Sequence, residues 1–276
     1  MEILDGKKLS EKITAELKEK INKLRDKVKL SVIMVGYDAA SASYVNMKKK
    51  KCNEIGIQCL VISLEANIMQ EKIIGTIENL NNDPNVTGIL VQLPLPPQIN
   101  TRKVLDSVRR EKDADGLSSY HLSRLLLNEE KIAPATPKGV IRLLDEYKIQ
   151  IKGKNVCLVG YGDTVGKPLS LILLNREATV DICHIRTENL KEHTIKADIV
   201  ISAAGVPGLI KADMIKEGAI VVDIGINKVS GEIRGDVDFE SVKEKCSYIT
   251  PVPGGVGPMT IVMLIENLIR LKETYN

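Results

Sequence analysis

The sequence predicts an α/β protein of two α/β domains with parallel sheets, the second of them Rossmann-like. Short apolar runs alternate with helical patterns along most of the chain, which is typical of β-α-β units. The chain has 276 residues, whereas single domains usually have about 100–200. Aromatic residues make up only 3% of the sequence. The core must therefore consist mainly of Ile, Leu and Val, as in buried parallel strands.

The first half of the chain contains one alternating series. Apolar residues recur every three or four positions from Leu9 to Leu24, which predicts an amphipathic helix. The charged segment before it has the same helical pattern and is not typical of a signal peptide. The prolines after Gln92 end the series, and residues 101–131 have a helical and irregular pattern. The expected elements are a strand at 30–36, a helix at 41–55, a strand at 57–63, a helix at 70–81 and a strand at 86–92.

The second half repeats the alternation, with strands expected at 154–160, 178–184, 197–205 and 219–225. The segment KVSGEIRG predicts a hairpin, and the last helix is expected at 260–272. These patterns predict a first domain at residues 1–133 and a second at 134–259, with a C-terminal helix, 260–276, that could pack back on the first. Ligands of open parallel sheets bind at the carboxyl ends of strands. The expected functional edges therefore carry Gln92, Gly160, Gly205 and Gly225.

Composition excludes several classes of protein. The net charge of +3 is too small for a nucleic-acid-binding face. The five cysteines are odd in number and lack a C-x-x-C spacing, which indicates reduced thiols in a cytoplasmic protein. The three histidines form no metal-ligand motif, and no apolar run approaches the roughly 18 residues of a membrane span. We expect a cytoplasmic protein with no metal, no membrane and no nucleic acid.

A glycine-rich loop follows the strand expected at 154–160. Its glycines would permit a tight turn and the close approach of a pyrophosphate to a helix N-terminus. A plain strand-to-helix turn is the alternative, but the segments AAGVPG and DIGIN follow two later strands, as a dinucleotide site requires. The residues assigned to the cofactor on these grounds are Gly160, Tyr161, Gly162, Gly166, Gly205 and Ile226.

The identity of the dinucleotide depends on the second strand of this domain. An acidic residue at the end of that strand would accept the ribose 2′-hydroxyl of NAD. Asp181 has about the right spacing but lies in the middle of the strand, whereas Arg186 follows the strand end and could face a 2′-phosphate. NADP is therefore favoured, and NAD stays possible.

Six segments together resemble the methylenetetrahydrofolate dehydrogenase/cyclohydrolase family. They occur in the family's order and cover nearly the whole chain. They are YVNMK at 44–48, GILVQLPL at 88–95, KDADGL at 112–117, PATPKG at 134–139, VDIGIN at 222–227 and PVPGGVGPMT at 251–260.

The resemblance implies a first domain that binds folate, a second that presents the nicotinamide, and a homodimer formed through the second domain. It implies oxidation of 5,10-methylenetetrahydrofolate to the 5,10-methenyl form and hydrolysis of that form to 10-formyltetrahydrofolate. The family typically has Gly-Arg-Ser where this chain has Gly160, Tyr161 and Gly162, and a phosphate-binding Ser where it has Ile185. Arg186 could compensate for the lost phosphate contacts.

The implied catalytic residues are Lys48, Tyr44 and Gln92. Tyr44 and Lys48 are four apart on the expected helix and so share a face. Lys48, made less basic by burial, would transfer protons in the hydrolysis, Tyr44 would stack on the folate, and Gln92 would hold the amine.

Four residues are assigned to substrate binding: Tyr44, Asp115, Gly257 and Pro258. Asp115 would accept the paired N–H donors of the pteridine, whereas Asp113 would brace its turn. Gly257 and Pro258 belong to a stiff loop, 253–258, that could form a wall of the site. The run from Lys48 to Lys51 could be a solvated helix face or a contact for an acidic ligand tail.

Two other functions stay open. One is a monofunctional NAD-dependent methylenetetrahydrofolate dehydrogenase, which the altered loop favours and the presence of Lys48 and Gln92 opposes. The other is a dinucleotide-sensing module without catalysis. Dehydrogenases of the shikimate or amino-acid type would share the second domain but would not explain Tyr44, Gln92 and Asp115 together.

Overall fold

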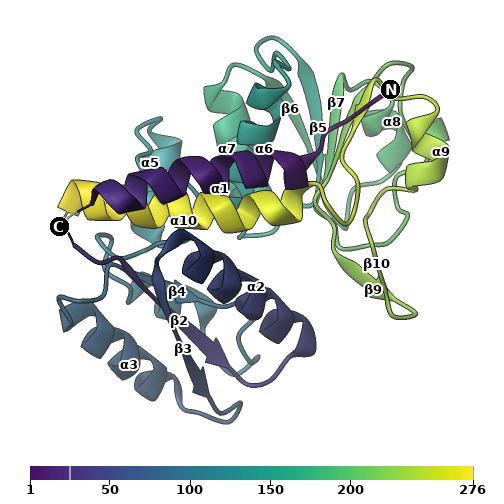
Figure 1. The fold of residues 1–276 in the computed structure, drawn as a ribbon. Coiled ribbons are helices and arrows are strands. Elements are labelled where there is room, and N and C mark those ends of the chain that lie inside the picture. The colour runs from purple at the N-terminus through teal and green to yellow at the C-terminus, as the bar shows by residue number, and fades with distance from the viewer. Residues whose placement is uncertain (25, 276) are drawn as a thin grey trace. The chain divides into compact units, whose positions relative to one another are not determined.

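The computed structural model describes residues 1–24 and 26–275, which form two compact units (Figure 1). Unit 1 consists of Met1–Glu11 and Thr136–Thr260, and unit 2 of Lys12–Ala135 and Ile261–Asn276. The fold class expected from the sequence is confirmed, because each unit is built on a parallel sheet.

Unit 2 has a three-stranded parallel sheet in the order β3-β2-β4. The chain moves to one side of β2 through α2 and then to the other side through α3. Because such connections are right-handed, these two helices cover opposite faces of the sheet, as Figure 1 shows. The elements that lie wholly in unit 2 are β2 (Lys29–Val35), α2 (Ala39–Ile55), β3 (Gln58–Leu64), α3 (Gln70–Asn82), β4 (Gly88–Val91), α4 (Thr101–Asp106) and α5 (Ser119–Leu126).

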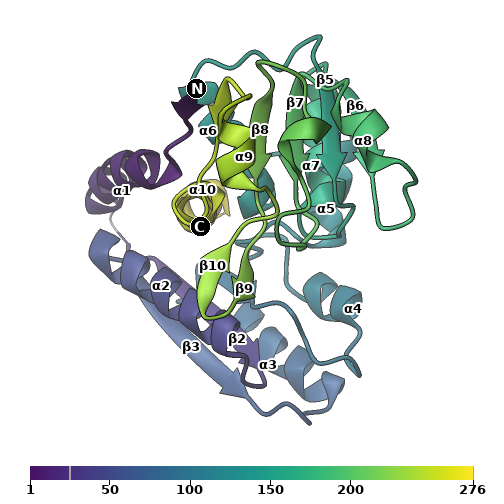
Figure 2. The same ribbon diagram turned by 90° about the vertical axis from the view of Figure 1, so that its right-hand side faces the viewer.

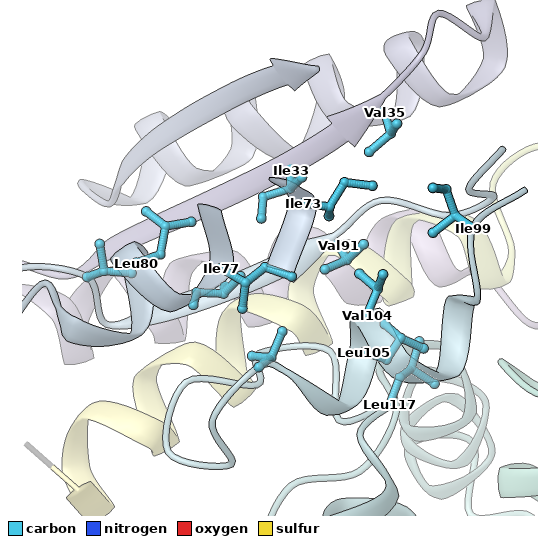
Figure 3. Packing of buried hydrophobic residues seen from close by; sticks show 13 residues of the cluster. Ile33, Val35, Ile73, Ile77, Leu80, Val91, Ile99, Val104, Leu105 and Leu117 are labelled. Atoms are coloured by element: carbon cyan, nitrogen blue, oxygen red, sulfur yellow. The ribbon is translucent and has the colours of Figure 1, made fainter. Parts of the chain in front are cut away.

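The core of unit 2 on the α3 side contains mostly β-branched and leucine side chains, as the scarcity of aromatic residues requires (Figure 3). Side chains from β2, α3, β4 and α4 meet there, and Ile33, Ile73, Ile77 and Val104 are fully buried. This packing fixes the direction of β4 and thereby the position of Gln92, which follows it.

The C-terminal helix α10 (Val256–Tyr275) begins in unit 1, and its residues from Ile261 onward belong to unit 2. A Cβ on Gly88 would lie 2.4 Å from Leu268 Cδ1, so the Leu268 side chain of α10 packs directly against the backbone of β4 at this glycine. The buried Asn267 side chain donates hydrogen bonds to the carbonyls of Ala114 (3.1 Å) and Ala133 (2.8 Å). The helix therefore clamps the segment that carries Asp115.

Unit 1 has a six-stranded parallel sheet in the order β1-β11-β8-β7-β5-β6, part of which is visible in Figure 2. From β5 the chain first moves to β6 and then returns to β7 on the other side of β5. This reversal creates a switch point between β5 and β7, where open sheets bind ligands. The strands of unit 1 are β1 (Glu2–Ile3), β5 (Asn155–Val159), β6 (Thr179–Cys183), β7 (Ile199–Ser202), β8 (Ile220–Asp223) and β11 (Tyr248–Ile249), with a hairpin of β9 (Asn227–Val229) and β10 (Glu232–Arg234).

The helices of unit 1 cover both faces of this sheet, since α7 leads from β5 to β6 and α8 returns from β6 to β7. They are α6 (Ala135–Glu146), α7 (Gly166–Asn175), α8 (Leu190–Thr194), a 3-10 turn η1 (Ala212–Met214) and α9 (Phe239–Lys243). Helix α1 (Gly6–Lys23) begins in unit 1, and its residues from Lys12 onward belong to unit 2.

Two expectations differ from the structure at the chain's ends. The segment before Leu9 is not wholly helical, because Glu2–Ile3 forms β1, which pairs with β11 in the sheet of unit 1. That pairing places residues 1–11 in unit 1, whereas the sequence placed them in the first domain. At the other end, α10 already begins at Val256. Gly257 and Pro258 therefore lie in its first turn and not in a loop, and a proline fits there because its missing N–H has no helical partner.

Two buried aspartates hold the loops at the carboxyl ends of β7 and β8. The Asp236 carboxylate accepts hydrogen bonds from Ser202 Oγ (3.0 Å) and Asn227 Nδ2 (3.0 Å). It also accepts from three consecutive backbone N–H groups, at residues 204, 205 and 206. The Asp223 carboxylate accepts from the N–H groups of residues 225, 236 and 237, and burial raises the pKa of Asp223 to about 6.

Within the described residues, no helix is long and apolar enough to cross a lipid bilayer.

Replacing Asp236 by asparagine should destabilise unit 1 and loosen the loop at 203–206. The amide would point an N–H₂ group at donors that now share a carboxylate, so buried N–H groups would lose their acceptor. We expect a loss of about 2–4 kcal/mol in the free energy of unfolding, measured by urea denaturation. Asp238→Asn is the matched control, because Asp238 is exposed and its loss should change stability by less than about 0.5 kcal/mol. Equal effects of the two substitutions would contradict this role of Asp236.

Candidate functional site

The structure brings four of the residues singled out in the sequence together within unit 2: Tyr44, Lys48, Gln92 and Asp115. Helix α2 carries the first two. Its start is fixed by the Asp38 side chain, which accepts a hydrogen bond from Ser41 N (2.7 Å), and it ends at Gly56 in the left-handed conformation. Tyr44 and Lys48 lie on the same face, with the Lys48 Nζ 5.0 Å from the centre of the Tyr44 ring. This separation is within the range of a cation–π contact.

The Lys48 side chain is almost fully buried, with 6% of the residue exposed. Its Nζ donates a hydrogen bond to Gln92 Oε1 (3.0 Å), which is the contact expected from the sequence. Burial lowers the pKa of Lys48, because an ammonium loses hydration inside the protein, and the negative charge of Asp115 opposes this effect. The outcome is an amine that gives up its proton more readily than a surface lysine.

Gln92 has a fixed orientation. Its backbone N–H donates to Ile33 O (2.8 Å), which continues the pairing of β4 with β2 by one residue. Its side-chain Nε2 donates to Leu93 O (2.7 Å). Because the amide nitrogen has this partner, the oxygen is directed at Lys48, and this network assigns the amide orientation. Gln92 therefore acts as an acceptor that positions the amine of Lys48.

Asp115 and Asp113 have different environments. Asp113 is buried and accepts hydrogen bonds from the backbone N–H groups of Gly116 (2.9 Å) and Ser118 (2.8 Å), so its expected role as a brace of the turn is confirmed. Asp115 is half-buried and accepts one backbone hydrogen bond from Ala135. Burial raises the pKa of Asp115 to about 6, although the charge of Lys48 acts in the opposite direction.

Sequence reasoning missed two further neighbours of Lys48. Cys52 lies one turn further along α2, and Cys59 lies on β3; both are buried. A hydrogen bond with Cys59, together with burial, raises the pKa of the Cys52 thiol. Both thiols act on Lys48 in the same direction as Asp115, because they oppose the lowering of the Lys48 pKa by burial. The i, i+4 spacing from Lys48 to Cys52 on the expected helix was the available signal.

In unit 1 the glycine-rich loop connects β5 to α7 at the switch point. Gly160 has φ +111°, and a Cβ there would lie 2.3 Å from Ala203 O; a Cβ on Gly166 would lie 2.1 Å from Gly160 O. These two glycines are required by the fold. Around Gly162 a Cβ would meet nothing within 4 Å, so the packing of the chain itself does not require glycine there. Tyr161 is 45% exposed, with Lys167 Nζ 5.4 Å from its ring centre.

Other residues assigned to the cofactor also lie in unit 1. Arg186 and Ile185 are exposed in the turn after β6, where the Arg186 N–H donates to His184 Nδ1 (3.1 Å). Asp181 lies within β6 and its carboxylate contacts His193 Nδ1 at 2.6 Å. Asp181 therefore already has a partner within unit 1. It also lies in the middle of β6, whereas an acidic residue that binds the ribose of NAD would lie at the end of the strand.

Gly205 follows β7 with φ +67°, and Ile226 follows β8 and is 56% exposed. A Cβ on Gly257 would lie 3.8 Å from Ile226 Cδ1. Gly257 and Pro258 thus belong to unit 1 and lie near a residue assigned to the cofactor, whereas the other residues assigned to the substrate belong to unit 2.

The sequence matches known proteins over nearly its whole length. Residues 4–115 match the catalytic domain of tetrahydrofolate dehydrogenase/cyclohydrolase, and residues 134–276 match its NAD(P)-binding domain. The bifunctional protein FolD of Nitratiruptor is 54% identical over 98% of this chain and 97% of its own. The crystal structure of the bifunctional FolD from Campylobacter jejuni has a TM-score of 0.96 and 49% identity, and covers 99% of each chain.

A third relative was solved with a ligand. The Trypanosoma brucei methylenetetrahydrofolate dehydrogenase-cyclohydrolase, complexed with NADP and an inhibitor, has a TM-score of 0.94 and 36% identity, over 99% of this chain and 97% of that one. Matches of this extent and identity leave one conclusion: the chain belongs to the tetrahydrofolate dehydrogenase/cyclohydrolase family.

Proposed function

We propose that the protein oxidises 5,10-methylenetetrahydrofolate to 5,10-methenyltetrahydrofolate with NADP and hydrolyses the product to 10-formyltetrahydrofolate. The observation that carries this proposal is the buried Lys48 amine held by Gln92 beside Asp115, in a chain of this family. A monofunctional dehydrogenase needs no such amine, and a module that only senses the dinucleotide needs none of the three side chains.

In the hydrolytic step, water attacks the electrophilic carbon between N5 and N10. The neutral Lys48 amine takes a proton from this water as the carbon–oxygen bond forms, which gives a tetrahedral carbinolamine. The C–N5 bond then breaks as the Lys48 ammonium returns a proton to N5 and the hydroxyl proton leaves for solvent. The net reaction consumes one water and releases one proton. A positioned proton-transfer group of this kind contributes about 10²–10⁴-fold to the rate.

Tyr44 and Gln92 position the reacting groups. The Tyr44 ring, half-buried one helical turn before Lys48, provides a flat face on which the folate stacks. Gln92 accepts from Lys48 Nζ and so limits the directions in which the amine can face. Without this acceptor the side chain would sample other rotamers, and the proton transfer would lose its geometry.

Hydride transfer needs contact between the methylene carbon and nicotinamide C4 and no protein acid or base, so it depends on positioning. Gly160, Tyr161, Gly162 and Gly166 would hold the dinucleotide pyrophosphate, and Gly205 and Ile226 would contact the rest of the cofactor. Arg186 would bind the 2′-phosphate of NADP. Its exposure and the NADP bound by the Trypanosoma brucei relative support this assignment, and NAD is the second candidate.

Asp115 binds the aminopyrimidine edge of the pteridine through its carboxylate, a bidentate arrangement that suits paired N–H donors. Gly257 and Pro258, in the first turn of α10, are the further residues assigned to substrate binding, and they belong to unit 1. Unit 2 supplies the folate site and unit 1 the dinucleotide site, so the domains expected at 1–133 and 134–259 keep these roles apart from residues 1–11, which belong to unit 1.

The protein works in the cytoplasm as a homodimer joined through its second domain. All five cysteines are buried and free, which supports a reducing compartment.

The function is tested by supplying 5,10-methylenetetrahydrofolate with NADP or NAD, and following reduced nicotinamide and the methenyl species separately. The wild-type protein should form reduced nicotinamide faster with NADP, and the methenyl species should then be consumed. Lys48→Met should lower hydrolysis by at least about 10²-fold while dehydrogenation continues, so that the methenyl species accumulates. Lys49→Met is the matched control, because Lys49 is exposed on the same helix. Normal hydrolysis by Lys48→Met would remove Lys48 from the mechanism.

Folate binding should depend on pH through Asp115. Its pKa is raised to about 6, so the carboxylate that accepts the pteridine donors is present above pH 6 and is lost as the pH falls through 6. Folate affinity of the wild type should therefore weaken below pH 6, as measured by fluorescence titration.

Asp115→Ala should weaken folate binding at all pH values and remove this step in the pH profile, while dinucleotide binding stays unchanged. Equal loss of folate and dinucleotide binding would show that Asp115 has a structural role instead.

A further inference from the structure

A cluster of possible metal ligands lies in unit 1, on the edge strand β6 and the helix α8, whereas the residues assigned above to catalysis belong to unit 2. One donor atom each from Asp181, Cys183 and His193 lies within 4.8 Å of the other two. The sequence showed no metal-ligand motif, because these residues follow a D-x-C-x₉-H spacing that is not one of the familiar patterns.

The fold explains why these side chains meet. Residues two apart on a strand point to the same face, so Asp181 and Cys183 both face the side of β6 that α8 covers. Helix α8 presents His193 to them, and its Nδ1 lies 2.6 Å from Asp181 Oδ2. Figure 2 shows α8 beside β6.

We propose that Asp181, Cys183 and His193 form a binding site for a borderline divalent transition metal, with Zn²⁺ as the natural occupant. A thiolate, an imidazole and a carboxylate are the three ligand types that zinc takes in proteins. The sulfur disfavours Mg²⁺ and Ca²⁺, which prefer oxygen ligands only. On binding, the metal displaces the thiol proton of Cys183, which leaves for solvent.

The geometry needs only small adjustments. Zinc bonds of about 2.0 Å to nitrogen or oxygen and 2.3 Å to sulfur place tetrahedral donor atoms roughly 3.3–3.8 Å apart. The Asp181 to His193 contact would open slightly, and Cys183 would approach both. The side chains of Asp181 and His193 are 51% and 37% exposed, so they are free to adjust and leave a path for the ion. Cys183 is buried and provides the rigid end of the site.

A second cysteine, Cys157 on β5, lies next to Cys183. Its Sγ lies 3.8 Å from that of Cys183, and it pairs in register with Asp181 on the adjacent strand. The proposed site therefore has a second thiol behind it and solvent on its open side. With three protein donors, it would leave one coordination position for water.

The three proposed ligands lie on both sides of the turn that carries Arg186, the residue assigned to the 2′-phosphate of the dinucleotide. Asp181 and Cys183 precede the turn that carries Arg186, and His193 follows it. A bound metal would tie the two ends of this turn together. This consequence rests on the proposed function, whereas metal binding itself does not.

The test uses the full-length protein, stripped with a chelator and kept in a phosphine reductant so that Cys157 and Cys183 stay reduced. Titration with Co²⁺ should give about one equivalent bound per chain, with a thiolate-to-cobalt charge-transfer band that Zn²⁺ removes by competition. Cys183→Ser should abolish the band. Loss of a residue that only supports a metal ligand typically weakens metal binding by roughly 10–100-fold. Because His193 is proposed as a direct ligand, His193→Gln should weaken the affinity for Co²⁺ by at least this much.

Two matched variants control for general effects. Cys246→Ser removes another buried cysteine of unit 1, and His184→Gln removes the histidine at the end of the same strand; both should leave the band and the affinity unchanged. If Cys183→Ser does not fold, His193→Gln carries the test, because His193 is partly exposed. A wild-type protein without the charge-transfer band, or a His193→Gln variant with unchanged affinity, would overturn the proposal.

Discussion

The hydrogen bond between the buried Lys48 amine and the Gln92 side chain is the interaction on which the proposed chemistry depends. An amine in water is protonated at neutral pH and cannot accept a proton. Removing it from water lowers its pKa, and the chain does so with a residue that is only 6% exposed. Gln92 then supplies a neutral acceptor, which holds the amine without adding a charge that would favour its protonation.

The surrounding architecture serves to keep this pair in place. β4 positions Gln92 through its pairing with β2, and the cap at Asp38 fixes the start of the helix that carries Lys48. The Asp115 segment is held from two sides, by the brace of Asp113 and by the clamp of Asn267 on α10. The opposing charges of Lys48 and Asp115 partly stabilise each other, so each acts on the other's pKa. A change at either residue should therefore alter the protonation of both.

Much of this arrangement could be predicted from the sequence, because long amphipathic helices and buried strands leave strong periodic signals. Helix α1 and the strand before Gln92 belong to this group, whereas the hairpin of β9 and β10 was predicted from the turn residues of KVSGEIRG. The strand at Glu2–Ile3 could not be found, since two residues show no periodicity and the pairing partner lies at the other end of the chain. The role of Asp236 was missed for a similar reason. Its carboxylate accepts hydrogen bonds from backbone N–H groups, and the sequence does not show which backbone groups will face a given side chain.

The central claim is that burial leaves Lys48 less basic than an ordinary lysine. An NMR titration of the protein labelled with ¹⁵N-lysine tests it most directly, with the Lys48 Nζ signal assigned by its absence in Lys48→Met. The account predicts that Lys48 titrates clearly below the ordinary lysine pKa of 10.5. A Lys48 signal that titrates at or above 10.5 would contradict it.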